Sequence, residues 1–456
     1  MTGTPALLLR RHAVKTNGMG RTFLRRRALF LLPLGVLLSS RVASADDAKF
    51  VPSARTDLPT LVDAVSKGAP TLQQDRLSID LARSDAQQSR LYENPTLDAT
   101  IGTIPIGRTN PPDLADPMLN VPNYSIGVSY RFLLGKRASR HARADALIKA
   151  AQAGFDSSAR DNAVNLARLL GSLAADEVRL DALQGVLEQA KAAVVLAKSR
   201  ETAGIGTPLD TDRLSIEQAR VEQSIRTTEA DRDSLLATCP SLTGQACNTF
   251  TSANEARGFL SAWVKQASKA EGALEDRPDI RALDASREAA SYESKFAQAQ
   301  KIPDLTLRLG YTHDRFVISG NQQNSLSLTL SIPLPLFDAG QAQRTAAEAK
   351  AMRTELQRKQ TLDSDAARLS TLRSTLARQE RRHVALITET IPKAKAVVDD
   401  LERAATPRLI PLTDLIQARR SLSELAEDEA DSMSEQFTTA VTILSLLPVN
   451  ASRFSP

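Results

Sequence analysis

Two pairs of strands, about two hundred residues apart, constrain the fold of this 456-residue chain most strongly. We expect strands at about 95–103 and 123–133, and again at about 303–314 and 324–332. Apolar and polar residues alternate in each of them, as in the segment LTLRLGY at 305–311. Such alternation places apolar side chains on one face of a strand and polar ones on the other. Each pair therefore needs an apolar medium on one side only, either a bilayer or a protein core.

Residues 1–45 predict a secretory signal peptide. Three arginines at 25–27 precede an apolar run at 28–38, and small residues follow up to Ala45. A basic segment, a short apolar segment and an A-x-A site are the parts of a cleaved signal. The alternative is a membrane-anchoring helix, but such a helix needs about 20 apolar residues and the run at 28–38 is shorter. Both Met1 and Met19 are possible start sites.

Loss of the signal reverses the net charge of the chain. Residues 1–45 contain eight of the 58 basic residues and none of the 53 acidic ones. The mature chain then has 50 basic and 53 acidic residues, a net charge of −3. A nucleic-acid-binding surface requires clustered excess positive charge, so we expect no nucleic-acid partner.

Most of the remaining sequence predicts long helices, in an order that repeats. A proline-free segment at 136–200 and a segment at 341–403 each precede a break and a further helix. These segments predict long helical hairpins at about 136–238 and about 340–447, each preceded by a shorter helix and a strand pair. We therefore expect two structural repeats, 46–275 and 276–456. The alternative, a coiled-coil rod, does not account for the strand pairs.

The strand faces indicate how the strands are used. Strands of about 9–11 residues fit an outer membrane, with the apolar face toward lipid and the polar face toward a wet lumen. Arg131 and Arg308 lie on the polar face and are candidate lumen-facing residues. Four strands cannot close a barrel with a lumen, and open sheet edges are not tolerated in lipid. A barrel must then be shared among subunits; a small periplasmic sandwich stays open as the alternative.

Four segments resemble outer-membrane efflux proteins, the TolC-like channels. RPDIRA at 277–282 resembles the opening of the family's second half, and PLPLFDAGQ at 333–341 resembles its strand-to-helix segment. GIGTPLD at 204–210 and LTDLIQA at 412–418 resemble its two hairpin tips. The resemblance extends over about 57–447, nearly the whole mature chain.

This resemblance implies a mainly α fold with a small β part. Three protomers with four strands each would form a 12-stranded barrel in the outer membrane, continued by a helical barrel in the periplasm. The homotrimer would be the passive exit duct of a tripartite efflux or secretion system, with a periplasmic adaptor and an inner-membrane transporter as partners. The alternatives are a periplasmic helical adaptor, expected to have one hairpin only, and a structural coiled-coil protein.

The resemblance also assigns residues to the periplasmic tips, where the family's pore narrows. The candidates are Gly204 and Asp210 at the first tip and Arg408, Asp414 and Gln417 at the second. Asp414 matches the family's tip carboxylate, Gln417 stands where a second acidic residue often follows, and Arg408 replaces a glycine. Acidic residues there would form a ring that favours cations. The alternative role of both aspartates is helix N-capping.

The remaining chemistry in the sequence is sparse. Cys239 and Cys247 are the only cysteines, and in an oxidising compartment we expect a local disulfide; two free thiols are the alternative. The histidines of the mature chain, His141, His313 and His383, lack metal-ligand spacing. No phosphate-binding, hydrolase or metalloprotease motif is present. We therefore expect no enzyme activity, no metal and no cofactor, and the sequence does not identify the exported substrate.

Overall fold

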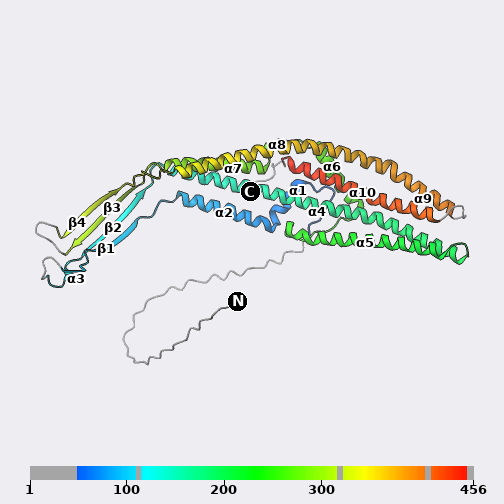
Figure 1. Ribbon diagram of the computed structural model, residues 1–456, viewed down its shortest axis with the longest axis horizontal. Helices are drawn as coiled ribbons and strands as arrows, with labels where there is room; N and C mark the ends of the chain where they lie inside the picture. The colour runs from blue at the N-terminus through cyan, green and yellow to red at the C-terminus, as the bar shows by residue number, and fades with distance from the viewer. Residues whose placement is uncertain (1–48, 109–113, 316–321, 406–411, 449–456) are drawn as a thin grey trace, which may run out of the picture. The chain divides into compact units, whose positions relative to one another are not determined.

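The computed structural model describes residues 49–108, 114–315, 322–405 and 412–448 (Figure 1). These residues form long helices and one small sheet, and the sheet lies at one end of the helices. Within the described ranges, no helix is both long and apolar enough to cross a membrane.

The sheet has four antiparallel strands in the order β1-β2-β3-β4. They are β1 (Thr96–Gly102), β2 (Asn123–Phe132), β3 (Leu305–Asp314) and β4 (Asn324–Ser331). The central pair, β2 and β3, comes from different halves of the chain, so the two strand pairs form one sheet rather than two. All four strands lie within the segments that alternation predicts, and β1 is the shortest of them.

The helix that precedes the first strand pair is broken in two. Where the sequence predicts one helix, the structure has α1 (Leu58–Gly68) and α2 (Pro70–Arg90). The Asp57 carboxylate accepts the Thr60 N–H at 3.0 Å and caps α1. Pro70 starts α2, because a proline fits the first turn of a helix but not its interior. A short helix, α3 (Pro117–Asn120), precedes β2.

The first hairpin consists of α4 (Arg137–Thr202) and α5 (Pro208–Thr243). Its predicted end at about 238 is wrong, because α5 continues through Pro240 to Thr243. Pro240 lies in the last turn, and the helix ends at Gly244, whose φ of 72° suits glycine. The sequence prediction also missed α6 (Ala253–Lys269), whose first turn Ser252 caps through the Glu255 N–H at 3.2 Å.

The second half contains a 3₁₀ turn (Leu274–Asp276), α7 (Pro278–Ala299), α8 (Gln341–Ala385), α9 (Ile391–Ala405) and α10 (Leu412–Leu446). Within the segment 341–403, a π-helical turn, Leu386–Thr390, separates α8 from α9, which has Pro392 in its first turn. Proline removes one backbone donor from a helix, and a π turn is one way in which a helix accommodates such a defect. Figure 1 shows α8 and α9 following one another along a single curved path.

The main hydrophobic core lies among the helices, between α1, α4, α6, α8 and α10. Phe259, Trp263 and Phe437 are almost fully buried there, with ring centroids 5.4–5.9 Å apart. The Trp263 indole N–H donates to the Thr56 carbonyl at 2.9 Å. A Cβ on Gly171 would lie 2.0 Å from the Phe437 ring, so a glycine permits the close approach of α4 and α10.

Candidate functional site

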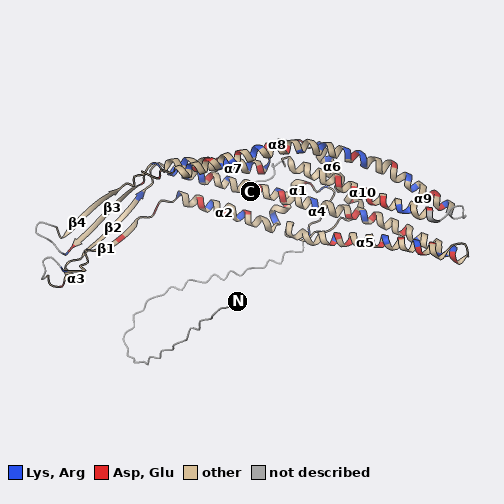
Figure 2. Ribbon diagram, viewed as in Figure 1, with Lys and Arg blue, Asp and Glu red and all other residues tan. Residues whose placement is uncertain are grey.

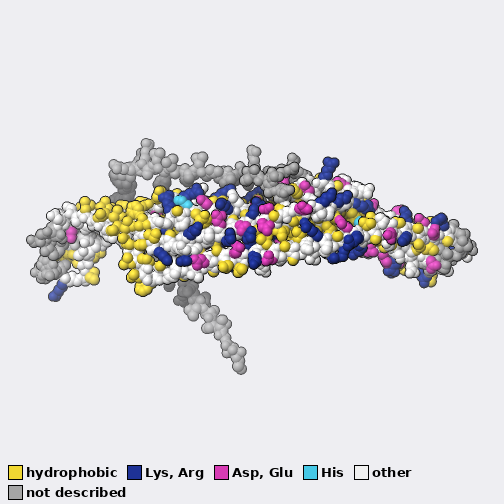
Figure 3. Space-filling view, turned by 90° about the horizontal axis from the view of Figure 1, so that it is seen from above, with side chains coloured by type: hydrophobic (Ala, Val, Ile, Leu, Met, Phe, Trp, Pro, Cys, Tyr) yellow, Lys and Arg dark blue, Asp and Glu magenta, His cyan; other side chains and the backbone are white. Residues whose placement is uncertain are grey.

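The apolar face of the sheet is exposed along its whole width. This face carries the exposed side chains of Leu97, Ile101, Tyr124, Ile126, Val128, Phe132, Leu307, Leu309, Tyr311, Leu326, Leu328 and Leu330. Figure 3 shows hydrophobic side chains gathered around the sheet and its junction with the helices, whereas charged side chains are spread over the helices. A contiguous apolar surface of this kind marks contact with another protein or with a membrane.

The opposite face of the sheet is polar and holds an ion pair between strands that are not neighbours. Arg308 on β3 reaches Asp98 on β1, with its Nε 3.2 Å from both carboxylate oxygens and its Nη2 also in contact with the carboxylate. Gly127 on β2 is paired with Asp98 and lies between the two. A Cβ on Gly127 would lie 2.8 Å from the Arg308 Cζ, so the guanidinium crosses β2 where a side chain is missing.

Two further ion pairs lie where the sheet meets the helices. Arg131 donates to Glu93 through Nε at 2.6 Å and through Nη2 at 2.9 Å. The ammonium group of Lys136 lies 2.7 Å from the Asp304 carboxylate, and both side chains are mostly buried. Register places Arg131 and Arg308 on the same face of the sheet, the polar one. That this face lines a lumen stays a prediction.

The turn between α4 and α5 uses its glycines and a reciprocal cap. Gly204 has a φ of 71° and ends α4, while the Ile205 N–H donates to the Arg200 carbonyl at 2.8 Å. The Thr207 hydroxyl accepts the Asp210 N–H at 3.3 Å and donates to the Asp210 carboxylate at 2.8 Å. Asp210 therefore takes part in the N-terminal cap of α5.

The second tip is described only from α10 onward. Asp414 and Gln417 are both exposed in the first two turns of α10, three residues apart and thus on one side of the helix. Asp414 occupies the first turn of α10, as Asp210 does in α5. Arg408 lies outside the described residues.

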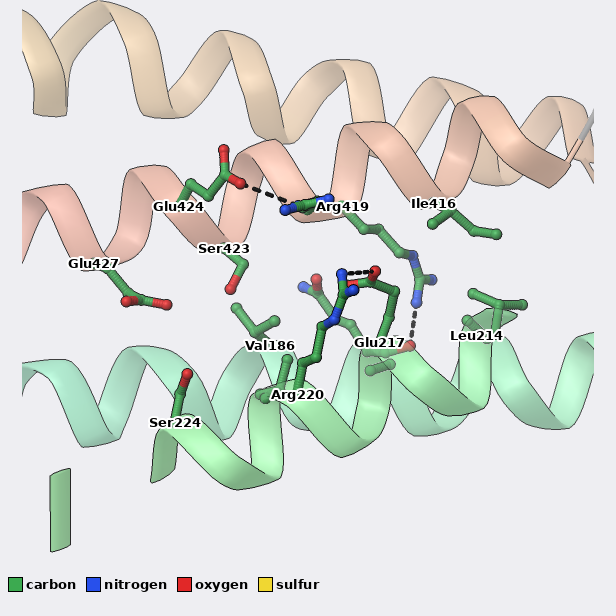
Figure 4. Close-up of a pocket in the computed structure, with 15 residues that line it drawn as sticks. Val186, Leu214, Glu217, Arg220, Ser224, Ile416, Arg419, Ser423, Glu424 and Glu427 are labelled. Atoms are coloured by element: carbon green, nitrogen blue, oxygen red, sulfur yellow. Dashed lines mark hydrogen bonds and ion pairs between the residues drawn. The ribbon is translucent and has the colours of Figure 1, made fainter. Parts of the chain in front are cut away.

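A cavity of about 230 Å³ lies between α4, α5 and α10, close to these tips. Figure 4 shows ion pairs around it: Glu217 accepts from Arg220 at 2.7 Å, and Glu424 accepts from Arg420 at 3.2 Å. Leu214 and Ile416 line its apolar part. The cavity thus has a mixed charged and apolar lining.

Arg419, which the motif comparison did not single out, connects three helices beside this cavity. It donates to the Gln189 carbonyl of α4 and to the Glu402 carboxylate of α9. It shares a helix face with Leu415 and Leu422, which are buried in a small core at this end of the molecule. The sequence shows that Arg419 lies on the same helix face as these leucines, but no local pattern identifies Gln189 and Glu402 as its partners.

Arg160 is a second connection that sequence reasoning missed. It is buried and donates to the last carbonyls of α10, at 3.3 Å to Leu444 and 2.7 Å to Ser445. Burial lowers the pKa of Arg160 to about 10. Its neighbour Arg277, from the RPD segment, donates to Asp279 at 2.9 Å and to Asp365 at 2.5 Å. The Arg160 contacts join the first half of the chain to the second, whereas those of Arg277 lie within the second half.

The structure contains a disulfide between Cys239 and Cys247, whose Cα atoms are 5.9 Å apart. The bonded loop pairs with the N-terminal segment, because the Phe50 N–H donates to the Ala246 carbonyl at 2.8 Å and the Asn248 N–H to the Phe50 carbonyl at 2.9 Å. The disulfide therefore holds the loop on which the start of the described chain rests. Over the described ranges, no group of three or more His, Cys, Asp or Glu side chains is arranged to hold a metal ion.

Comparison with known proteins identifies the class to which this fold belongs. The family model described as outer membrane efflux protein matches residues 61–245 and 270–447, so the chain belongs to that family. The family consists of efflux channels rather than enzymes, located in the outer membrane of Gram-negative bacteria with a helical part in the periplasm. Its match in two halves follows the two series of elements seen in the structure.

Individual relatives agree with this assignment. The chain is 26% identical over 209 residues to the cobalt-zinc-cadmium resistance protein CzcC of Cupriavidus metallidurans, a match that spans 45% of this chain and about half (48%) of that relative. The outer-membrane channel OprN superposes with a TM-score of 0.67 at 21% identity, over 88% of this chain and 93% of OprN. The outer membrane protein VceC of Vibrio cholerae superposes with a TM-score of 0.66 at 19% identity, over 86% and 96%.

Proposed function

We propose that three copies of this chain form the outer-membrane exit duct of a tripartite efflux or secretion system. The observation that carries this proposal is a sheet with an exposed apolar face and two edge strands, β1 and β4. β1 and β4 are antiparallel, so β4 of one protomer can pair with β1 of the next and continue the same pattern. Three sheets joined in this way give a closed 12-stranded barrel, which satisfies every backbone group in lipid.

The helices can also form a closed ring, because the helical layer of each protomer has two edges that can pack against neighbouring protomers. α2, α4, α7 and α8 follow one another as packed neighbours, so α2 and α8 occupy the edges of a helical layer (Figure 1). Both edges expose apolar pairs at helical spacing, Leu77 and Leu81 on α2 and Met352 and Leu356 on α8. Unlike edges that attract each other form a ring when the rotation between copies closes. A cyclic trimer covers both edges of every protomer.

The far end of the helices is where we place the periplasmic aperture and the adaptor. In the trimer, Asp414 and Gln417 would be repeated three times near the axis, together with Arg408. The cavity between α4, α5 and α10 lies beside them and offers paired charges and an apolar floor to a helical partner. The duct performs no chemistry; an inner-membrane transporter would supply the energy and the choice of substrate.

Two measurements on the purified protein test the duct and its aperture. In planar bilayers we expect discrete conductance steps, and a folded protein without conductance would contradict the proposal. At the aperture, Asp414→Asn removes a carboxylate and should weaken the preference for cations. Asp210→Asn is the matched control, because its carboxylate already accepts from Thr207, and its effect should be smaller. Unchanged selectivity in Asp414→Asn would count against the aperture role.

A further inference from the structure

The polar face of the sheet has few charges, and these are compensated within the protomer. Away from the strand ends, the charged residues of the described strands are Asp98, Arg131 and Arg308. Arg131 is paired with Glu93, and Arg308 is paired with Asp98. At the ends of the strands this face also carries Gly102, Asn123 and Asp314. The rest of it consists of small polar residues and glycines: Thr96, Thr100, Ser125, Gly127, Ser129, Thr306, Gly310, Thr312, Ser325, Ser327, Thr329 and Ser331.

The Arg308–Asp98 pair has a geometry that neutralises both charges close to the sheet. The two residues lie on β3 and β1, and Arg308 can reach Asp98 only by crossing β2. Gly127 leaves the space for this crossing, and a Cβ on Gly310 would also lie 3.0 Å from the Arg308 Nη1. Two glycines in adjacent strands thus let the guanidinium lie along the sheet instead of standing away from it.

Stability alone is a weak reason for this arrangement. About a third of each side chain is exposed, 31% for Arg308 and 35% for Asp98, and ion pairs at such exposure contribute little to the free energy of unfolding. Its stronger effect is on the local potential. An uncompensated charge beside a water-filled passage attracts one sign of ion and repels the other, and a trimer would repeat that charge three times.

We propose that the Arg308–Asp98 pair determines the ion selectivity of the middle of the strand-built part of the channel by holding the net charge there at zero. This inference rests on the proposed function, because it requires the polar face to line the lumen. Two residues of the same protomer, Arg308 and Asp98, would then set the selectivity. They can contact each other because Gly127, which lies between them, has no side chain. Substrates of either charge would then pass the sheet without an electrostatic barrier from its polar face.

The test is the cation-to-anion permeability ratio in planar bilayers across a salt gradient. Asp98→Asn leaves Arg308 unpaired and should shift the ratio toward anions, and Arg308→Gln should shift it toward cations. A unit charge acting over about 10 Å of water changes the local ion concentration about twofold, so each variant should change the ratio by at least about twofold. The measurement belongs at about 0.01 M salt, where the Debye length is about 30 Å.

The double variant D98N/R308Q should return to the wild-type ratio, since the two losses cancel. Asp63→Asn removes an exposed carboxylate from α1, away from the sheet, and should leave the ratio unchanged. Single variants that conduct with wild-type selectivity would overturn the inference while leaving the duct itself intact. A wild-type protein that does not conduct would instead contradict the proposed function.

Chemical modification separates selectivity from assembly. Both native cysteines are joined in a disulfide, so Arg308→Cys introduces the reactive thiol in an assembled channel. A cationic methanethiosulfonate reagent should restore the wild-type ratio, and an anionic one should increase the cation preference further. Equal ratios after both reagents, with the label verified by mass, would overturn the inference.

Discussion

The helices of this chain bury many of their apolar side chains, whereas the sheet exposes those on one face. Leu170 in α4 is fully buried, whereas Leu328 in β4 is 70% exposed. Charged residues are spread along the helices, whereas few lie in the sheet (Figure 2). The sheet instead exposes apolar side chains on one face. A chain that folds in water throughout would bury both sets, so the difference indicates that the two regions face different solvents. The predictions below test this difference.

The largest expected effect comes from the helical core. Phe437→Ala removes a buried ring that contacts Phe259 and Trp263, and it should lower the free energy of unfolding by about 3–5 kcal/mol. Leu330→Ala is the control in the sheet, where the side chain is 59% exposed. In detergent, Leu330→Ala should change the melting temperature far less. Equal losses in both variants would contradict the contrast between the regions.

The next effect concerns the solvent that the sheet faces. Leu328→Arg puts a charge on the apolar face near the middle of β4, and such a change costs about 2–4 kcal/mol at the centre of a bilayer. Less of this variant should be recovered in the outer membrane. Thr329→Arg, on the polar face of the same strand, should insert normally. Normal insertion of both proteins would show that the apolar face does not meet lipid.

The third prediction concerns the disulfide-bonded loop at 239–247, which pairs with the N-terminal segment of the described chain. Replacing Cys239 and Cys247 by serine removes the closure of a short loop, which is worth about 2.5 kcal/mol in the chain-entropy model. Thermal unfolding should occur at a lower temperature. Because Phe50 pairs with this loop, limited proteolysis should also cleave near the N-terminal segment sooner. An unchanged protection of that segment would show that the loop holds it without the disulfide.

The smallest effect depends on pH. Burial, assisted by Asp231 and Glu177, raises the pKa of Asp176 to about 6. A raised carboxyl pKa means that the folded protein binds the proton more tightly, so stability is lost as pH rises from about 4 through 6. Asp176→Asn avoids this loss and should be more stable than wild type above pH 6, by about 1 kcal/mol after allowance for solvent screening. The two melting temperatures should converge near pH 4; a constant difference would contradict the shift.

The sequence predicted the elements well where a single period dominates. Alternation located all four strands, and the proline-free segment at 136–200 predicted α4. The end of α5 was placed too early, at about 238, whereas the helix continues through Pro240 to Thr243. The helix α6 was missed because it lies in a segment that connects the two halves of the chain. The role of Phe259 and Trp263 becomes clear only from their packing in the main core.

The candidate site was predictable only in part, because its contacts depend on pairings between distant segments. Alternation placed Arg131 and Arg308 on the polar face. The contact of Arg308 with Asp98 depends on β3 lying beside β2, which no local pattern reveals. Arg160 and Arg419 were missed for the same reason, since each binds carbonyls of a helix far away in the sequence. The family resemblance pointed to the hairpin tips, and the structure adds that Asp210 takes part in a helix cap.

The most direct test of the account is the state of the mature protein in the cell. Membranes separated by density and treated with a crosslinker should contain this chain in the outer-membrane fraction, as a trimer that dissociates on heating. A closed barrel of three four-stranded sheets requires this result, because a single sheet would leave two edges unpaired in lipid. A mature protein recovered from the periplasm as a soluble monomer would contradict the account.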